Sequence, residues 1–485
     1  MRPAVAGTLA TALVAAGAAQ PGSPFALKHA HAWFLGIPGA TTDVHRGMVL
    51  GLLAVYGGVG ILVVVWYQLA QALRCHPGFP VRRLAPLLAL WALPILVAPP
   101  LFSQDVYIYA AVGAMVSHGV DPYHVGTVAL GASPYGALVD PFWRTHPSPY
   151  GPLFLAVAAT IVNLTFRHVL ATVAGLRVLE VASVAVLAVC ATRLARLYRR
   201  DPAEVFALAV LNPVTLLLLV GSAHNDAFML ALLASGLLLA KRGRPALGIL
   251  LCSLAAAVKF PAGLGVLYIA WGWLGPRAGW RDRLRPLLTA LLICFCVMEV
   301  LARATGLGWG WLGALGTPGT VRTWLDPSTA IGLMGSAVSR FLGIGPSEAL
   351  ILSVTRGAGD VLAVAVCVAL LWHSPRLGRA KTLGLGLLTV VALGPIIQPW
   401  YFSWGIVVLA PVAAGRLRAA VIGLSVFAVL LPLQDGGAVL GPLGVAAAVV
   451  ALVGVVLVVS RPGPFVVPTR RALARLGVPR GASDP

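Results

Sequence analysis

Apolar runs of membrane-crossing length fill most of this chain and limit its possible folds more than any other feature. A straight helical crossing needs about 20 mainly apolar residues, and inside a bilayer the backbone must satisfy its own hydrogen bonds. Of the 485 residues, 59% are hydrophobic and only 10% are charged, and the mean hydropathy is +0.91. We therefore predict an all-α polytopic membrane protein.

The apolar runs predict a bundle of about 13–14 transmembrane helices within a single domain that covers residues 1–460. The first run is either a cleaved signal peptide or a retained helix, and the many later runs favour the retained helix. Two further apolar pieces, 152–166 and 328–343, are short and are expected to lie in the interface or to re-enter the membrane. The expected spans lie near residues 4–19, 48–73, 84–101, 171–195, 204–221, 226–240, 245–258, 261–274, 286–304, 350–372, 382–397, 401–415, 419–434 and 437–460.

The net charge of +20 comes mostly from Lys and Arg in short loops between the apolar runs. Cytoplasmic loops of membrane proteins are enriched in these residues, so the pattern orients the bundle. It predicts cytoplasmic termini, and the basic stretch 461–485 reads as a cytoplasmic tail. We exclude nucleic acid as a partner because there is no soluble basic domain or aromatic platform. The basic segments are 74–83, 193–200, 241–244, 277–285, 376–381, 416–418 and the tail.

No metal site or cofactor is predicted. The six cysteines lie in or beside apolar runs and form no CxxC pair, as expected of small buried side chains. His224 and Asp226 are possible metal ligands, but their spacing matches no familiar ligand set. A divalent metal remains an alternative, although the spacing of these two residues does not support one.

The longest polar passage, residues 102–151, is predicted to be an extracytoplasmic loop. It follows the run 84–101, and its fourth residue, Asp105, stands at the membrane boundary, where acids are candidates for function. Asp105 is either a general base that accepts a hydroxyl proton or a helix cap. Tyr109 is a further candidate here, as a ligand-binding or an interface aromatic.

The same loop carries aromatic residues between acids and an arginine. Asp-Pro turns explain Asp121 and Asp140 structurally, but acids beside aromatic rings also suit a sugar. Tyr123 and Tyr150 are the accompanying aromatics. Arg144 is a candidate phosphate ligand because a guanidinium binds phosphate well.

Four other segments are expected on the same face as this loop, and one of them is the Trp-rich loop 305–327. His224, Asn225 and Asp226 open a helix, where a cap explains one polar residue but not three. Lys259 lies in a turn between apolar half-spans, where its cation would either bind a lipid phosphate or extend to the interface. The last segment contains Gln398, Trp400 and Tyr401, which either line a substrate site or belong to the lipid belt.

Together these stretches resemble a GT-C-type glycosyltransferase and, more narrowly, the actinobacterial polyprenol-phosphomannose-dependent α-1,6-mannopyranosyltransferases. The resemblance implies a many-helix fold whose first large extracytoplasmic loop carries the catalytic aspartate, a position that Asp105 matches. A second acid is often discussed in such enzymes, and Asp121 and Asp140 both remain open. The matching stretches are DVYIYAAVGAMVSHGVDPY (105–123), DPFWRTHPSPYGPLF (140–154), SAHNDAFMLALL (222–233), AAAVKFPAGLGVL (255–267) and IIQPWYFSWG (396–405).

The resemblance implies mannosyl transfer at a bacterial plasma membrane. Polyprenyl phosphate mannose would be the donor, and the 6-hydroxyl of an α-mannan or lipoglycan the acceptor, in one inverting displacement. Lys259, Arg144 and His224, in that order, would stabilise the departing phosphate. The alternatives are a GT-C enzyme for another polyprenyl-phosphate sugar, a flippase or transporter of a lipid-linked sugar, and a non-catalytic membrane assembly partner. A transporter would favour polar residues at mid-membrane and inverted repeats.

Overall fold

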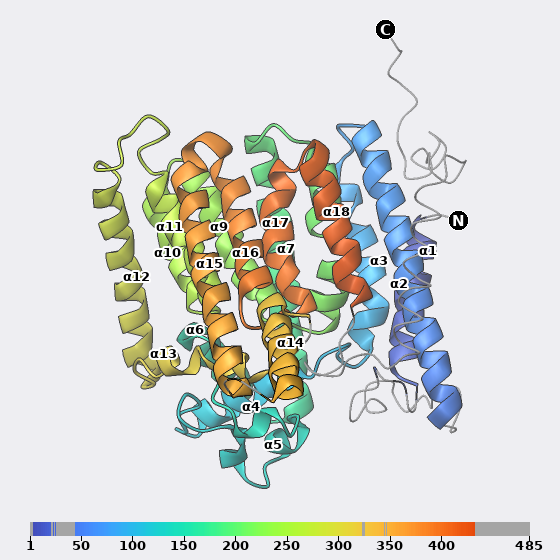
Figure 1. The fold of residues 1–485 in the computed structure, drawn as a ribbon. Helices are drawn as coiled ribbons and strands as arrows, with labels where there is room; N and C mark the ends of the chain where they lie inside the picture. The colour runs from blue at the N-terminus through green and yellow to red at the C-terminus, as the bar shows by residue number, and fades with distance from the viewer. Residues whose placement is uncertain are drawn as a thin grey trace.

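A computed structural model describes residues 3–20, 23, 25, 44–322, 325–343, 345 and 347–431. In these ranges the chain forms helices joined by turns and irregular segments, with no β-strand (Figure 1). The prediction of an all-α polytopic membrane protein is confirmed. The expected span 437–460 and the basic tail 461–485 lie outside the described residues.

The α-helices follow one another along the chain as a bundle with several short helical turns between them. The main helices are α1 (Pro3–Ala18), α2 (Val44–Cys75), α3 (Ala85–Val97), α4 (Asp105–Ser117), α5 (Pro134–Leu138), α6 (Pro152–Leu164), α7 (Val169–Leu197), α8 (Pro202–Ala209), α9 (Asp226–Lys241), α10 (Pro245–Ala256), α11 (Leu264–Trp271), α12 (Leu284–Thr305), α13 (Trp311–Ala314), α14 (Pro327–Leu342), α15 (Glu348–Leu377), α16 (Arg379–Leu393), α17 (Phe402–Leu409) and α18 (Gly415–Leu430). The short turns that matter for the site are η5 (Val214–Gly221), η6 (Phe260–Gly263), η8 (Pro399–Tyr401) and η9 (Ala410–Val412).

Four of the described helices are long and apolar enough to cross a membrane on their own. The expected span 204–221 is instead two pieces, α8 and η5, bent by 51°. Pro213 stands at the break, where it has no N–H to continue the helix, and the Asn212 side chain accepts a 2.9 Å bond from the N–H of Val214. Many of the other expected spans are shorter apolar helices. The four long helices are His45–Cys75, Val169–Leu197, Leu284–Thr305 and Glu348–Leu377.

The two ends of the bundle differ in composition. The α2–α3, α11–α12, α15–α16 and α17–α18 connections, which contain Lys and Arg or directly adjoin helix ends that carry them, lie together at the upper end of Figure 1. The polar stretch with α4 and α5 lies at the lower end, beside α13 and α14. The grouping of loops that the charge pattern predicts is therefore present in the fold.

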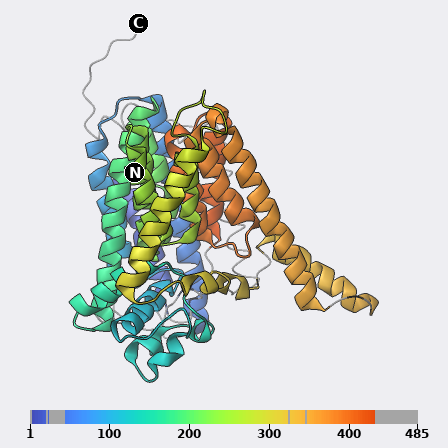
Figure 2. The same ribbon diagram turned by 90° about the vertical axis from the view of Figure 1, so that its left-hand side faces the viewer.

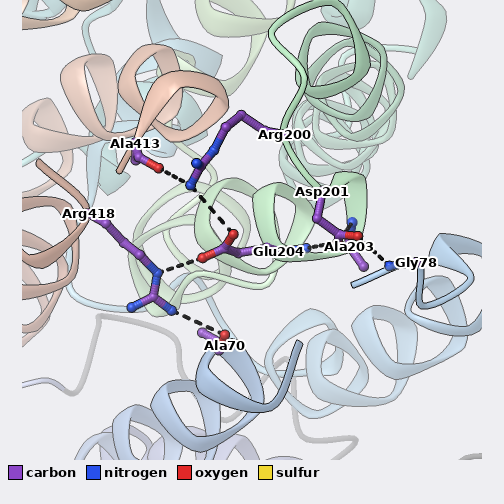
Figure 3. A network of polar contacts seen from close by, with 8 residues as sticks. All are labelled: Ala70, Gly78, Arg200, Asp201, Ala203, Glu204, Ala413 and Arg418. Atoms are coloured by element: carbon purple, nitrogen blue, oxygen red, sulfur yellow. Dashed lines mark hydrogen bonds and ion pairs between the residues drawn. The ribbon is translucent and has the colours of Figure 1, made fainter. Parts of the chain in front are cut away.

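A buried ionic network ties the helices together at the basic end (Figure 3). Arg418 Nε donates to Glu204 at 2.6 Å, and its Nη2 reaches the carbonyl of Ala70 on α2 at 3.2 Å. Arg200 lies 3.7 Å from the other Glu204 oxygen and donates to the Ala413 carbonyl. Because the carboxylate has two cationic partners, the charge is compensated, and the network joins α2, α8, α18 and the loop before α18.

The polar stretch is less loop-like than its composition predicts, because it opens with the 13-residue helix α4. Residues Val106 to Met115 of this helix are all buried, and α4 packs along α6. The small residue Gly113 permits the close approach, since a Cβ there would lie 2.8 Å from the Ala158 backbone. A helix that is buried all round shows no polar face in its sequence, which explains why it was not recognised.

The two apolar pieces that were not expected to cross are both helical. They form α6, with 13 residues, and α14, with 16. Helix α14 packs against α15, and in Figure 2 this gold and orange pair projects sideways from the bundle at the end that carries the polar stretch. Both helices are shorter than a straight crossing needs.

Candidate active site

The Tyr109 hydroxyl connects the acid of the polar stretch to the start of α9. Asp105 is the first residue of α4 and is half-buried, and Tyr109 stands one turn later, so both side chains share a helix face. The hydroxyl lies 3.4 Å from Asp105 Oδ2 and 3.3 Å from Asn225 Oδ1. Its ring is fully buried and packs edge-on against Tyr150 and Phe154 at centroid distances of 5.0 and 4.9 Å. Three segments distant in sequence therefore meet at one side chain.

A buried ion pair lies next to this contact. Lys259 Nζ donates to both carboxylate oxygens of Asp226, at 3.0 and 2.9 Å, and the indole N–H of Trp404 donates to Oδ1. Asp226 occupies the first turn of α9, where the helix dipole favours a negative charge. The ammonium also lies over the rings of Tyr401 and Trp404, 4.5 and 5.6 Å from their centroids. Both charges are therefore compensated away from water.

Helix α7 holds the first turn of α9 in place. Glu180 Oε2 accepts a 3.1 Å bond from the N–H of Phe228, one of the first-turn donors that have no partner within the helix. Arg177, one turn earlier on α7, donates to the carbonyls of Ile95 and Ala98 at 2.7 and 2.6 Å, just where α3 ends. The turn before α9 also contains Ala223 with φ of 55°, a left-handed conformation that a residue other than glycine adopts at a cost.

Several fully buried polar atoms beside the ion pair have no hydrogen-bond partner within the described part of the chain. The His224 ring packs edge-on against Trp400, 3.8 Å between centroids. Burial, and then the Lys259 charge, hold the pKa of His224 well below its usual range, so the ring is neutral and offers one donor and one acceptor. Native interiors leave few polar atoms unsatisfied, so such a concentration marks a place for a polar ligand. The unpartnered atoms are His224 Nδ1 and Nε2, Asn225 Nδ2, Gln398 Oε1, Trp400 Nε1 and Ser403 Oγ.

Comparison with known proteins shows to which family the chain belongs. Residues 4–275 match the family model described as "Alpha-(1->6)-mannopyranosyltransferase, N-terminal domain". The chain belongs to this family. Residues 328–461 match a second model, "MptB C-terminal domain". The enzyme is thus a glycosyltransferase of the alpha-(1->6)-mannopyranosyltransferase family.

Curated relatives of the enzyme agree with this assignment. It is 34% identical over 405 residues to alpha-(1->6)-mannopyranosyltransferase A of Mycobacterium tuberculosis, covering 81% of this chain and 77% of the relative. It is 32% identical over 442 residues to alpha-(1->6)-mannopyranosyltransferase B of Corynebacterium glutamicum, covering 83% and 72%. A probable alpha-(1->6)-mannopyranosyltransferase of Mycolicibacterium smegmatis is 32% identical over 413 residues, covering 77% and 72%. No solved structure matches the chain.

The structure brings most of the predicted site residues of the enzyme into one cluster. The ring contacts between Trp400 and Tyr401, and the bond from Tyr109 to Asn225, make this cluster continuous. Tyr109 and Trp400 are buried, so neither belongs to a lipid belt. The predicted residues that these contacts bring together are Asp105, Tyr109, Tyr150, His224, Asn225, Asp226, Lys259, Trp400 and Tyr401, with Gln398 adjacent in the chain.

Three other predicted residues are engaged in the fold of the polar stretch. Asp121 accepts the N–H of Tyr123 at 2.8 Å and pairs with His124, and Asp140 accepts the N–H of Phe142 at 2.8 Å. Arg144 donates to the carbonyls of Val139 and Ala137 at 3.0 and 3.1 Å. None of these bonds reaches Asp105 or the ion pair.

Tyr123 joins this outer stretch to the cluster. Its hydroxyl donates to the Tyr150 carbonyl at 2.9 Å, and burial, followed by the charge of Asp121, raises its pKa far above the usual range. Burial also raises the pKa of Tyr150, with the Asp105 charge as the next cause, so both phenols remain protonated. Tyr123 therefore supports the site through the Tyr150 backbone.

Sequence reasoning missed two residues of the site. Trp404 was not singled out, although it follows Trp400 and Tyr401 at the three- and four-residue spacing that places side chains on one helix face. Glu180 was also missed, although an acid inside an apolar run is a recognised functional signal. Lys259 was expected either to bind a lipid phosphate or to extend to the interface, and in the structure its ammonium is paired with Asp226.

Proposed function

We propose that this enzyme transfers mannose from polyprenyl phosphate mannose to the 6-hydroxyl of an α-mannan or lipoglycan acceptor. The names of its relatives support mannosyl transfer and the α-(1→6) linkage. The observation that carries the proposal is the Tyr109 bridge, which connects Asp105 to Asn225, the residue next to Asp226 of the buried ion pair. An acid, a cation and a set of polar groups for hydroxyls are what glycosyl transfer from a lipid phosphate requires.

In the proposed reaction, Asp105 accepts the proton of the acceptor 6-hydroxyl while that oxygen forms a bond to the anomeric carbon. The bond between this carbon and the phosphate oxygen breaks on the opposite face, and the electron pair leaves with polyprenyl phosphate. One displacement of this kind inverts the anomeric centre. Lys259 stabilises the charge on the leaving phosphate. Arg144 and His224 lose that role in the proposal, because Arg144 is engaged by two carbonyls and His224 is neutral.

The unpartnered polar atoms are the proposed binding site for the sugar hydroxyls. A pyranose offers both donors and acceptors around its ring and an apolar face for an aromatic side chain. Neutral His224 supplies one donor and one acceptor, Asn225 two donors, and Gln398 an acceptor. Trp400 and Tyr401 form the adjoining aromatic wall. The proposal needs no metal and no other cofactor, because a phosphate leaving group calls for charge stabilisation rather than protonation.

We place the reaction at the extracytoplasmic face of the bacterial plasma membrane. Support comes from the basic connections, which lie at the opposite end of the bundle from the polar stretch. We also propose that both termini are cytoplasmic, as the charge pattern of the sequence predicts. The donor would enter sideways from the outer leaflet, and its polyprenyl chain would remain in the lipid bilayer.

The first test compares membranes that contain the wild type, Asp105→Asn or Asp140→Asn. Radiolabelled polyprenyl phosphate mannose and a short α-1,6-mannoside are added, and transfer is counted against the protein level. We expect the wild type and Asp140→Asn to transfer mannose and Asp105→Asn to lose activity, because the turn acid lies outside the cluster. An active Asp105→Asn variant would contradict the assigned base. Absence of transfer by every protein would point to another polyprenyl-phosphate sugar, to a flippase or to a non-catalytic partner.

A further inference from the structure

The two members of the buried ion pair differ in access. The Lys259 side chain is 11% exposed, whereas the Asp226 side chain is 0% exposed. The exposed part of the pair therefore belongs to the Lys259 side chain, and the carboxylate has no contact with solvent. The pair is asymmetric, because an anion can approach it only from the lysine side.

Asp226 keeps other partners if Lys259 turns away. The indole N–H of Trp404 donates to its Oδ1, and its place in the first turn of α9 favours a negative charge. Lys259 has a second set of partners as well, because its ammonium lies over the rings of Tyr401 and Trp404. Neither group depends on the ion pair alone. The distance between the ammonium and the carboxylate can therefore increase without leaving either charge buried and without a partner.

We propose that Asp226 is an exchangeable counter-ion that governs how tightly the enzyme holds polyprenyl phosphate. This inference rests on the proposed function, in which Lys259 stabilises the leaving phosphate. The phosphate competes with Asp226 for the ammonium when it binds. After transfer, Asp226 recovers the ammonium and thereby favours release of the polyprenyl phosphate product. Asp226 is thus a positioning residue that acts through Lys259.

The test measures product affinity instead of activity, using the full chain in lipid nanodiscs. Binding of a polyprenyl monophosphate is compared with binding of the same polyprenol without phosphate and with binding of inorganic phosphate. For Asp226→Asn we expect polyprenyl phosphate to bind at least about tenfold more tightly than to the wild type, because it no longer competes with a charged partner for Lys259. Affinity for the polyprenol should not change, and Asp226→Glu should resemble the wild type. Tighter binding of inorganic phosphate as well would indicate that the phosphate alone suffices.

Two further variants keep the proposal open to refutation. Trp404→Phe retains a ring near Lys259 but removes the N–H donor to Asp226, so the carboxylate holds the ammonium more firmly and polyprenyl phosphate should bind more weakly. Glu204→Gln disrupts the buried pair with Arg418 at the other end of the bundle and should leave phosphate affinity unchanged. A tightening in one variant and a weakening in the other cannot both come from damage to the fold.

Equal affinity for polyprenyl phosphate in the wild type, Asp226→Asn and Trp404→Phe would overturn the inference. A tightening in Glu204→Gln as large as that in Asp226→Asn would also overturn it, since the effect would then be unspecific. Failure of the proposed function has a different signature, namely no mannose transfer by the wild type. The binding measurements do not depend on turnover, so the two failures are distinguishable.

Discussion

Replacement of Tyr109 by phenylalanine tests whether the bridge between Asp105 and Asn225 contributes to catalysis. The change removes one hydroxyl and retains the ring that packs against Tyr150 and Phe154, so the fold should persist. Hydrogen bonds to charged groups contribute about 1.5–3 kcal/mol to stability. The two contacts of the Tyr109 hydroxyl, at 3.4 and 3.3 Å, are longer than the usual distance of about 2.7–2.8 Å for a hydroxyl donor. We therefore take the lower limit of this energy range, about 1.5 kcal/mol, as the contribution of the Tyr109 hydroxyl.

A loss of about 1.4 kcal/mol corresponds to a tenfold slower transfer, so a loss of about 1.5 kcal/mol should lower kcat about tenfold. The assay is the initial rate of mannose transfer at saturating donor, with thermal unfolding measured in parallel. Tyr135→Phe is the matched control, because its buried hydroxyl contacts Thr172 at 2.9 Å and takes no part in the cluster. Full activity in Tyr109→Phe would refute the reasoning, and so would an equal loss in the control.

Three other predictions concern stability, pH and metals. Glu204→Gln leaves Arg418 buried without its counter-ion and should lower the stability by about 3–5 kcal/mol, seen as a lower Tm, with the rate per folded enzyme unchanged. Because the pKa of folded His224 lies below the ordinary value of about 6.5, the unfolded chain binds more protons below that pH. Stability should therefore fall as the pH drops below about 6.5, and His224→Gln should reduce this slope in Tm against pH. Treatment with EDTA should leave the transfer rate unchanged, and recovery of a lost rate by an added divalent ion would contradict the absence of a metal from the proposed reaction.

The candidate site was predictable in part because its residues carry chemical signals of their own. Asp105, Lys259 and the His224-Asn225-Asp226 run stand out as polar groups at the ends of apolar runs. The positive-inside rule groups their loops on one face, and in the fold the contacts of Tyr109 and Lys259 bring these residues together. The partners of each residue were not predictable, because spacing along the chain does not determine which helices are neighbours.

The helical character of 105–117 was missed for a related reason. A helix buried on every side by α6 and other neighbours needs no polar face, so its sequence lacks the periodicity by which helices are recognised. Asp121 and Asp140 illustrate the opposite case, in which an acid that looks suited to a sugar accepts a backbone N–H in a turn. Identical residue types thus serve structural and candidate catalytic roles in one stretch.

The amino-acid sequence alone determined the all-α membrane class, the grouping of polar loops and the family, because hydropathy, charge and short motifs are properties of the chain itself. Only the tertiary structure decided that Lys259 is paired with Asp226, that Trp404 completes the pair and that Tyr109 joins Asp105 to Asn225. These contacts span up to 178 positions and arise from the packing of α4, α9 and α17. The free energy of such contacts depends on burial and on a geometry of a few ångströms, which the order of residues does not specify.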